Sequence, residues 1–253
     1  MKIPKNLFKQ ALQQRQQLGI WSTLSSNLMA ELFAGCGFDW IMIDTEHSPN
    51  ELPDLISQLQ AVHGHNISPV VRPAWSDMIL VKRILDAGAQ TLLFPNVQSA
   101  EEARAAVSYT RYPPEGVRGV TSSSRAASFG LNTGYLANAH HEICVLVQIE
   151  TGEALQHIEE IANVPGVDGV FIGPADLAAS LGHLGNPQHP EVQAAVDDAF
   201  RRLRALGKPA GYLTTNEAEV KRRVADGVEF IAIGTDTSII TRGATDLIRR
   251  VTE

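Results

Sequence analysis

Acidic and histidine side chains follow an apolar segment early in this sequence. The segment IMIDTEHSPN, residues 41–50, changes within a few positions from an apolar run to Asp44, Glu46 and His47. Because the unperturbed pKa of histidine lies near neutrality, His47 is suited to act as a general base, and a nearby carboxylate could orient its ring. The sequence leaves two carboxylates open for that second role, Asp44 and Asp86.

Two further carboxylates follow later apolar segments and predict a metal site. Glu150 ends the run VLVQIE, and Asp176 lies in GPADLAAS. Two carboxylates without a histidine or cysteine ligand beside them suit a hard divalent cation, Mg²⁺ or Mn²⁺, with Co²⁺ as a third candidate. The alternative is that each carboxylate only caps the start of a helix.

Arg72 follows the apolar residues SPVV and precedes Pro73. An arginine that leaves an apolar strand is costly to desolvate without an anionic partner, and its planar fork matches a carboxylate or an enolate oxygen. The alternative is an internal ion pair with one of the nearby acids. Similarly, Asp86 shares a predicted helix face with Arg83, so a plain surface salt bridge is the alternative to a role beside His47.

Eight short apolar runs, separated by helical segments, are the elements that must position these residues. This alternation predicts an α/β fold with a parallel sheet, and eight units in a chain of this length favour a single-domain (β/α)8 barrel. Residues that follow the strands of such a barrel meet at one mouth. The runs are LGIW from 18, DWIMI from 39, PVVR from 69, TLLF from 91, CVLVQI from 144, GVFI from 169, PAGY from 209 and FIAI from 230.

Two connections need separate comment. The stretch 95–143 is too long for one helix, and its centre is rich in Pro, Gly and Ser, so we expect a long active-site loop there. The segment IGTDTS after the eighth run could bind a phosphate or cap the last helix. No lysine follows a predicted strand at this mouth, since Lys82 is mid-helix and Lys208 precedes the seventh run; metal-assisted chemistry is therefore favoured over imine chemistry.

Composition excludes several classes of partner. The 253 residues carry a net charge of −7 and no cluster of Lys and Arg, which argues against nucleic acid. No apolar run approaches the roughly 18 residues of a membrane span, so no membrane association is expected. Cys36 and Cys144 lie far apart and lack metal-type spacing, which predicts buried free thiols in a reducing compartment, the cytoplasm by default.

Several segments together resemble the HpcH/HpaI family of class II, metal-dependent pyruvate aldolases. The resemblance covers nearly the whole chain and rests on FDWIMIDTEHSPN, PVVRP, RYPPEGVRGV, VLVQIET and GVDGVFIGPADLAASLGHLGNPQHPEVQ. It implies that Glu150 and Asp176 hold the divalent metal. It also implies that His47 is the base and that Asp86, rather than Asp44, makes it more basic.

The same resemblance assigns the contacts to substrate. It implies that Arg72 stabilises the enolate, and that Gln148 and the backbone at Ala175 and Asp176 contact the keto acid. One departure is Thr45, which stands where the family usually has glycine; we expect its side chain to narrow the mouth of the barrel and to alter the preference for the aldehyde.

The implied activity is reversible cleavage of a 4-hydroxy-2-oxo acid, of the heptanedioate type, to pyruvate and an aldehyde such as succinic semialdehyde. Two enzymatic alternatives stay open, a 2-dehydro-3-deoxyglucarate aldolase that releases tartronic semialdehyde and a lyase of CoA thioesters. A barrel that binds a metal and an organic acid without turnover is the alternative outside enzymes. The resemblance further implies a homo-oligomer, a hexamer with domain-swapped barrels.

Overall fold

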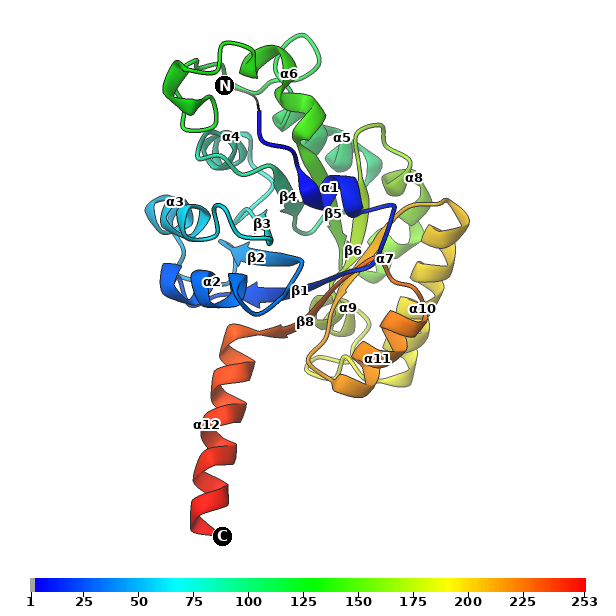
Figure 1. Cartoon of the computed structure of the whole chain (residues 1–253). Coiled ribbons are helices and arrows are strands. Elements are labelled where there is room, and N and C mark those ends of the chain that lie inside the picture. Colours follow the sequence, from blue (N-terminus) through cyan, green and yellow to red (C-terminus); the bar gives the residue numbers. More distant parts are fainter. Residues whose placement is uncertain (1–2) are drawn as a thin grey trace.

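The computed structural model describes residues 3–253, and its centre is a closed barrel of eight parallel strands (Figure 1). Each strand pairs with the next along the chain, and β8 pairs with β1 to close the barrel. This confirms the predicted (β/α)8 architecture. The strands are β1 Gln17–Ser22, β2 Trp40–Asp44, β3 Ser68–Arg72, β4 Thr91–Phe94, β5 Cys144–Ile149, β6 Gly169–Ile172, β7 Ala210–Leu213 and β8 Phe230–Thr235.

Helices follow the strands and cover most of the outside of the barrel (Figure 1). Strands such as β5 are buried along their whole length, as expected where helices cover one side and packed side chains fill the other. The helices are α1 Leu7–Ala11, α2 Asn27–Ala34, α3 Leu52–Ala61, α4 Met78–Asp86, α5 Ala100–Tyr109, α6 Tyr135–Glu142, α7 Gly152–Gln156, α8 Ile158–Ala162, α9 Pro174–Ser180, α10 Pro190–Ala205, α11 Glu217–Ala225 and α12 Asp236–Thr252.

Large side chains fill the interior of the barrel. Trp40 and Phe230 stack edge to face with ring centroids 6.3 Å apart, and Phe8 of α1 packs on both rings from below. Two glycines leave the space that these rings need, because a Cβ at Gly19 would lie 2.2 Å from the Trp40 ring and a Cβ at Gly211 would lie 2.1 Å from the Phe230 ring. The barrel is therefore packed below and open for chemistry only at its mouth.

The stretch 95–143 contains more regular structure than a loop. It holds α5, the short 3₁₀ turn Ser128–Gly130 and α6, with an irregular connection at 110–127 between α5 and the turn. Arg118 from this connection is fully buried and reaches α4. The connection thus docks against the helix that carries Asp86.

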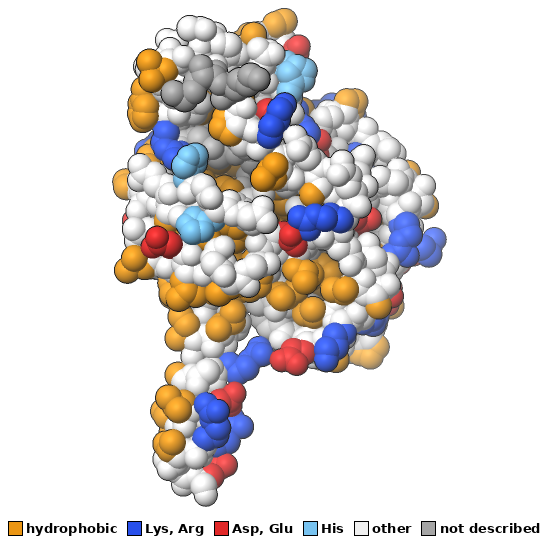
Figure 2. All heavy atoms as spheres, in the orientation of Figure 1, with side chains coloured by type: hydrophobic (Ala, Val, Ile, Leu, Met, Phe, Trp, Pro, Cys, Tyr) orange, Lys and Arg blue, Asp and Glu red, His pale blue; other side chains and the backbone are white. Residues whose placement is uncertain are grey.

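The last helix, α12, leaves the barrel and projects away from it (Figure 1). Its apolar side chains lie in the open, including Ile248 at 62% and Val251 at 74% exposure (Figure 2). The helix is held to the barrel at its start, where the buried Asp236 carboxylate accepts hydrogen bonds from the backbone of Thr23 and Leu24.

The structure tests two expectations drawn from composition, one about membrane spans and one about the cysteines. No helix within residues 3–253 is long and apolar enough to cross a membrane. Both cysteines are free, but only Cys144 is buried; Cys36 follows the end of α2 and is exposed, contrary to the expectation of two buried thiols. Cys36 lies one turn beyond the helix residues that pack inward, so the core does not cover it.

Candidate active site

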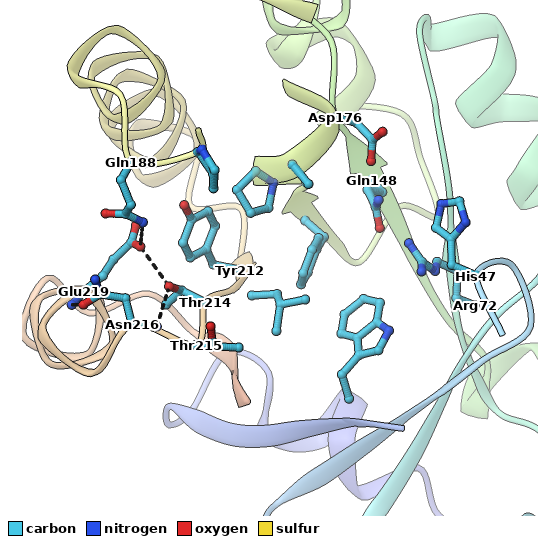
Figure 3. A pocket seen from close by; sticks show the side chains of 17 residues that line it. His47, Arg72, Gln148, Asp176, Gln188, Tyr212, Thr214, Thr215, Asn216 and Glu219 are labelled. Carbon is cyan, nitrogen blue, oxygen red and sulfur yellow. Dashed lines mark hydrogen bonds between the residues drawn. The ribbon is translucent and has the colours of Figure 1, made fainter. Parts of the chain in front are cut away.

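A cavity of about 430 Å³ opens at the carboxyl ends of the strands (Figure 3). The predicted residues His47, Arg72, Gln148, Ala175 and Asp176 all line it, which agrees with the expectation that polar residues after the strands meet at one mouth. The other lining residues are Trp21, Phe171, Gly173, Pro174, Pro187, Gln188, Tyr212, Leu213, Thr214, Thr215, Asn216 and Glu219.

Arg72, at the end of β3, is held by two carboxylates. Its Nε and Nη2 donate to the two oxygens of Asp44 at 2.8 and 2.5 Å, and its Nη1 lies 2.9 Å from Glu46. Burial opposes ionisation of Asp44, but the paired guanidinium outweighs it and lowers the pKa of that carboxyl. The internal ion pair is therefore present, and it fixes the guanidinium in one orientation at the edge of the cavity.

His47 lies in the loop after β2, on the same side of the cavity as Arg72 (Figure 3). Its side chain is exposed, and neither candidate carboxylate forms a hydrogen bond with it. Asp44 is engaged by Arg72, and Asp86 accepts a hydrogen bond from Nη2 of Arg118 at 2.8 Å. The structure therefore brings His47 to Arg72 but not to Asp86.

The partner of Asp86 is a residue that sequence reasoning missed. Arg118 is fully buried and lies over the rings of Tyr112 and Tyr135, at 4.5 and 5.7 Å from their centroids. Asp86 therefore does not form the surface salt bridge with Arg83 that its helix position suggested. Arg118 stands in the quoted segment RYPPEGVRGV, but nothing in that segment indicates which acid it would meet.

Glu150 follows β5 and is buried, with an exposed fraction of 5%. It accepts hydrogen bonds from the backbone N–H of Asn96 at 2.7 Å and from the side-chain amide of Gln148. Burial, with a contribution from the negative charge of Asp176, raises the pKa of Glu150 to about 7. Glu150 is thus a buried carboxylate that lacks a cationic partner in direct contact among residues 3–253.

Asp176 is the third residue of α9, is exposed, and points into the cavity (Figure 3). The residue at the cap position of this helix is Gly173, and no side chain caps it, so the capping alternative for Asp176 does not hold. The first backbone N–H groups of a helix have no partner within the helix. Those of Ala175 and Asp176 therefore remain available at the cavity.

Gln148 and Gly173 complete the surroundings of Glu150. The side-chain oxygen of Gln148 is buried and has no hydrogen-bond partner among the described residues. A Cβ at position 173 would lie 2.7 Å from a carboxylate oxygen of Glu150, so only glycine leaves room for this carboxylate. Carboxylate and amide oxygens without a cation nearby form an arrangement that suits a hard divalent cation.

Thr45 lies beside the cavity rather than in its wall. Its hydroxyl donates to the backbone carbonyl of Arg72 at 2.7 Å, and the residue lines a smaller neighbouring cavity between α3 and α4. The expected narrowing of the main mouth is not seen. Instead, Thr45 stabilises the backbone of Arg72 through this hydrogen bond.

The segment after β8 caps a helix, as one of its two interpretations predicted. The hydroxyl of Thr235 accepts from the N–H of Ser238, and the Ser238 hydroxyl accepts in return from the Thr235 N–H. With the Asp236 carboxylate buried beside this turn, the segment does not offer a phosphate site.

Three side chains outside this cavity, His183, His189 and Glu191, come close enough to suggest a second metal site. The two imidazole rings are stacked, with centroids 3.5 Å apart and planes 15° apart. Ring nitrogens bind a metal in the plane of the ring, so two parallel stacked rings cannot converge on one ion. His189 instead accepts from the Glu191 N–H and caps α10.

Fold and site together define a (β/α)8 barrel with a cavity lined by acidic, arginine and histidine side chains at its mouth. The profile of the HpcH/HpaI aldolase/citrate lyase family matches residues 17–242, and the chain belongs to this family. Aldolases are carbon–carbon lyases, and those of this family generally depend on a divalent metal.

Individual relatives agree with this assignment. The chain is 53% identical over 249 residues to "4-hydroxy-2-oxo-heptane-1,7-dioate aldolase" of Klebsiella pneumoniae, which covers 98% of this chain and 94% of the relative. It is also 53% identical over 251 residues to "Pyruvate aldolase" of Rhizobium etli, with 99% of each chain covered. A crystal structure of a family protein from Burkholderia cenocepacia superposes with a TM-score of 0.95 at 38% identity, covering 98% of this chain and 100% of that one.

Proposed function

We propose that this protein catalyses the metal-dependent, reversible aldol cleavage of a 4-hydroxy-2-oxo acid of the heptanedioate type. The products are pyruvate and an aldehyde such as succinic semialdehyde. Membership of the aldolase family and the names of the two relatives support this reaction. The observation that carries the proposal is Glu150, a buried carboxylate with its pKa raised to about 7 by burial. It lies directly behind Gln148 and Gly173 of the wall of the cavity that Asp176, Arg72 and His47 also line.

Glu150 and Asp176 would hold the divalent cation, and their oxygen ligands favour Mg²⁺ or Mn²⁺. The unpartnered oxygen of Gln148 fits such an ion, and Gly173 leaves the room that the Glu150 carboxylate occupies. When bound, the cation supplies Lewis-acid polarisation of the 2-oxo group. The free N–H groups of Ala175 and Asp176 would orient the carboxylate of the keto acid.

His47 accepts the proton of the 4-hydroxyl group, directly or through a water molecule. The C3–C4 bond then breaks, its electron pair forms the enolate of pyruvate, and C4 leaves as the carbonyl carbon of the aldehyde. Protonation of the enolate at C3 gives pyruvate and balances the reaction. Since the aldehyde departs first in cleavage, the pyruvate half can be studied without it.

Arg72 stabilises the negative charge that develops on the enolate oxygen. A guanidinium has five N–H groups, and two of them donate to Asp44. Nη1 forms an ion pair with Glu46 without a hydrogen bond, so three N–H groups remain for substrate. Because the two carboxylates already orient the group, little reorganisation is needed during the reaction, and such preorganised donors are effective in catalysis.

The test is NMR of the methyl protons of pyruvate in D₂O, with protein treated with EDTA and then supplied with Mg²⁺ or Mn²⁺. Enolate formation exchanges these protons for deuterium without any aldehyde. We expect exchange only when metal is present. Absence of exchange with every metal tried would refute the proposed reaction.

We propose that the protein is a homo-oligomer, a hexamer by resemblance, in which α12 packs against another copy. Five apolar side chains of α12 are exposed, an arrangement unusual for a helix of a monomer. Leu28 and Leu32 of α2 are likewise exposed at 70% and 56%. Light scattering of the full chain and of an Ile248→Glu variant tests this: the variant should form a smaller species, and a monomeric full chain would contradict it.

A further inference from the structure

The cavity of the candidate active site has two polar sides. In Figure 3, Arg72 and Asp176 lie on one side, and Thr215 and Asn216 lie on the other. The first side holds the keto acid in the proposed reaction, so the second side is left for the part of the substrate beyond C4. Apolar side chains that suit the two methylene groups of succinic semialdehyde also line the cavity, namely Trp21, Phe171 and Leu213.

The acid on the second side, Glu219, is already compensated. Its Oε1 lies 3.4 Å from Nη2 of the buried Arg223, and its Oε2 accepts from the side chains of Gln188 at 2.5 Å and Thr214 at 2.8 Å. Burial opposes the ionisation of Glu219, but these hydrogen bonds and the charge of Arg223 outweigh burial and lower its pKa. Tyr212 in the same wall stays a neutral phenol, because burial raises its pKa. A substrate anion on this side therefore depends on a further cation.

Arg242 brings such a cation to the rim of the second side. It lies near the start of α12, which follows β8 and therefore begins at the mouth of the barrel. Its Nη2 donates to the backbone carbonyl of Thr215 at 3.4 Å. Since Thr215 and Asn216 line the cavity, the guanidinium is in contact with a residue of the cavity wall.

The guanidinium of Arg242 is only weakly engaged by the protein. Its hydrogen bond to Thr215, at 3.4 Å, is longer than is usual for an N–H donor. Its Nη1 lies 3.8 Å from Glu217, and the two side chains are 53% and 80% exposed. An exposed ion pair of this kind contributes little to stability. The long side chain of Arg242 can therefore turn to an anion in the cavity at little cost to the fold.

Two neutral donors lie beside Arg242 at the rim. Within residues 3–253, no hydrogen bond engages the hydroxyl of Thr215 or the side-chain N–H groups of Asn216, whose own oxygen caps α11. A carboxylate can only accept hydrogen bonds, so a guanidinium, a hydroxyl and an amide N–H group are partners that suit it.

We infer that Arg242, together with the side chains of Thr215 and Asn216, forms the subsite that binds the terminal carboxylate of the heptanedioate-type substrate. The inference rests on the proposed aldol reaction and names the residue that selects its aldehyde. Arg242 is a specificity-determining residue: it binds the carboxylate of succinic semialdehyde while the methylene groups contact the apolar part of the wall. An aldehyde without a carboxylate lacks this contact.

The experiment compares succinic semialdehyde with butanal, which has the same chain length but a methyl group in place of the carboxylate. Both are assayed in the synthetic direction, with pyruvate and Mg²⁺ supplied. For the wild-type protein we expect kcat/KM for succinic semialdehyde to exceed that for butanal about tenfold. Arg242→Gln should lower this ratio about five- to tenfold, through a higher KM for succinic semialdehyde, and Arg242→Lys should retain part of the preference.

The matched control is Arg249→Gln, which removes the same charge from an exposed position two turns further along α12, where the arginine pairs with Asp246. We expect it to leave the ratio of the two acceptors unchanged. A merely structural role of Arg242, including one in a contact between copies of the chain, would reduce both acceptors equally. That result, or a wild-type protein without preference for succinic semialdehyde, would overturn the inference.

A second variant tests the same subsite with the opposite sign. Glu217→Gln removes the carboxylate that competes for Arg242, so the preference for succinic semialdehyde should rise about twofold. Added salt should reduce the preference of the wild-type protein and leave that of Arg242→Gln nearly unchanged, because the contact is exposed to solvent. An unchanged or lower ratio in Glu217→Gln contradicts the inference.

Failure of the proposed reaction would be seen separately, as absence of pyruvate proton exchange, which needs no aldehyde. Acceptor binding can then still be measured by saturation-transfer NMR on the protein loaded with Mg²⁺ and pyruvate. A signal from succinic semialdehyde that is weaker in Arg242→Gln than in wild type, with the butanal signal unchanged, supports the inference without turnover. Equal signals from succinic semialdehyde in the two proteins contradict it.

Discussion

Glu150 and Glu219 are both 5% exposed and both lie at the mouth of the barrel, yet their pKa values move in opposite directions. Burial is the largest influence on each. Around Glu150, hydrogen bonds from Gln148 and Asn96 do not offset burial and the charge of Asp176. Around Glu219, hydrogen bonds and Arg223 outweigh burial. Burial alone therefore does not set the ionisation of a buried glutamate, because the pKa also depends on whether hydrogen bonds and a cation compensate for burial.

The largest effect expected from this difference is on metal-dependent chemistry. Glu150→Gln keeps the shape of the side chain but removes the charge that a cation needs, so metal-dependent exchange of pyruvate protons should fall at least about a thousandfold. Glu153→Gln, at an exposed position on α7, is the control and should behave as wild type. Near-normal exchange in Glu150→Gln would remove this glutamate from the metal site.

The next largest effect is expected at Arg72, the arginine that lines the same cavity. Arg72→Ala should lower the rate of aldol cleavage about 100-fold or more, because a preorganised donor to the enolate oxygen is lost. Arg72→Lys keeps the charge but not the fork, so its rate should be intermediate. Circular dichroism must accompany both, since Arg72→Ala leaves Asp44 buried without its partner. A folded Arg72→Ala variant with normal turnover would exclude the arginine from the mechanism.

The two glutamates should affect stability with opposite signs when metal is removed. At pH 8 in EDTA, Glu150→Gln should raise the free energy of unfolding by about 1–3 kcal/mol, because it removes an uncompensated buried charge. Glu219→Gln should lower it by about 1–3 kcal/mol, because Arg223 loses one of its two partners. Urea unfolding measures both. Changes of the same sign would show that the two sites do not differ as described.

The raised pKa of Glu150 also determines whether the stability of the metal-free protein rises or falls with pH. Folded protein keeps the Glu150 proton up to a pH of about 7, whereas the usual value is 4.5. Between these values the folded state binds more protons, so this group makes the metal-free protein less stable as pH rises from 4.5 through 7. Urea unfolding of the wild-type protein at pH 5.5 and pH 8 should show this loss, and the Glu150→Gln variant should lack it.

The smallest effect concerns metal affinity. Below pH 7 a proton competes with the cation for Glu150, so affinity for Mn²⁺ should fall by up to about tenfold for each unit of pH. Calorimetric titration at pH 5.5, 6.5 and 7.5 measures this. An affinity that does not change over this range would indicate that Glu150 is already ionised in the metal-free protein.

Much of the fold was predictable from local patterns. The runs DWIMI and CVLVQI were predicted as strands and form β2 and β5. A short aliphatic run between helical segments is a local pattern, so predicting it requires no tertiary contact. The position of His47, Arg72 and Asp176 at one mouth also followed, since parallel strands of a barrel end on the same side.

Pairing between distant residues was not predictable. Asp86 meets Arg118, which is 32 positions away, and this contact depends on how the irregular connection after α5 packs on α4. Glu219 and Arg223 read as an ordinary pair on a helix surface, four positions apart, and nothing local indicates that both are buried. For this reason the sequence did not identify Glu219 as a residue that lines the cavity.

By itself, the amino-acid sequence determined the eight strands, their order, and the chemistry-bearing residues that follow β2, β3, β5 and β6, because strand periodicity and strand ends are local properties. Tertiary contacts alone set which of the buried carboxylates has a cation beside it and which does not. Ionisation depends on burial and on the charges within a few ångströms, and these come from segments far apart in the chain. Glu150 and Glu219 are equally buried and differ in the charges and hydrogen bonds that surround them.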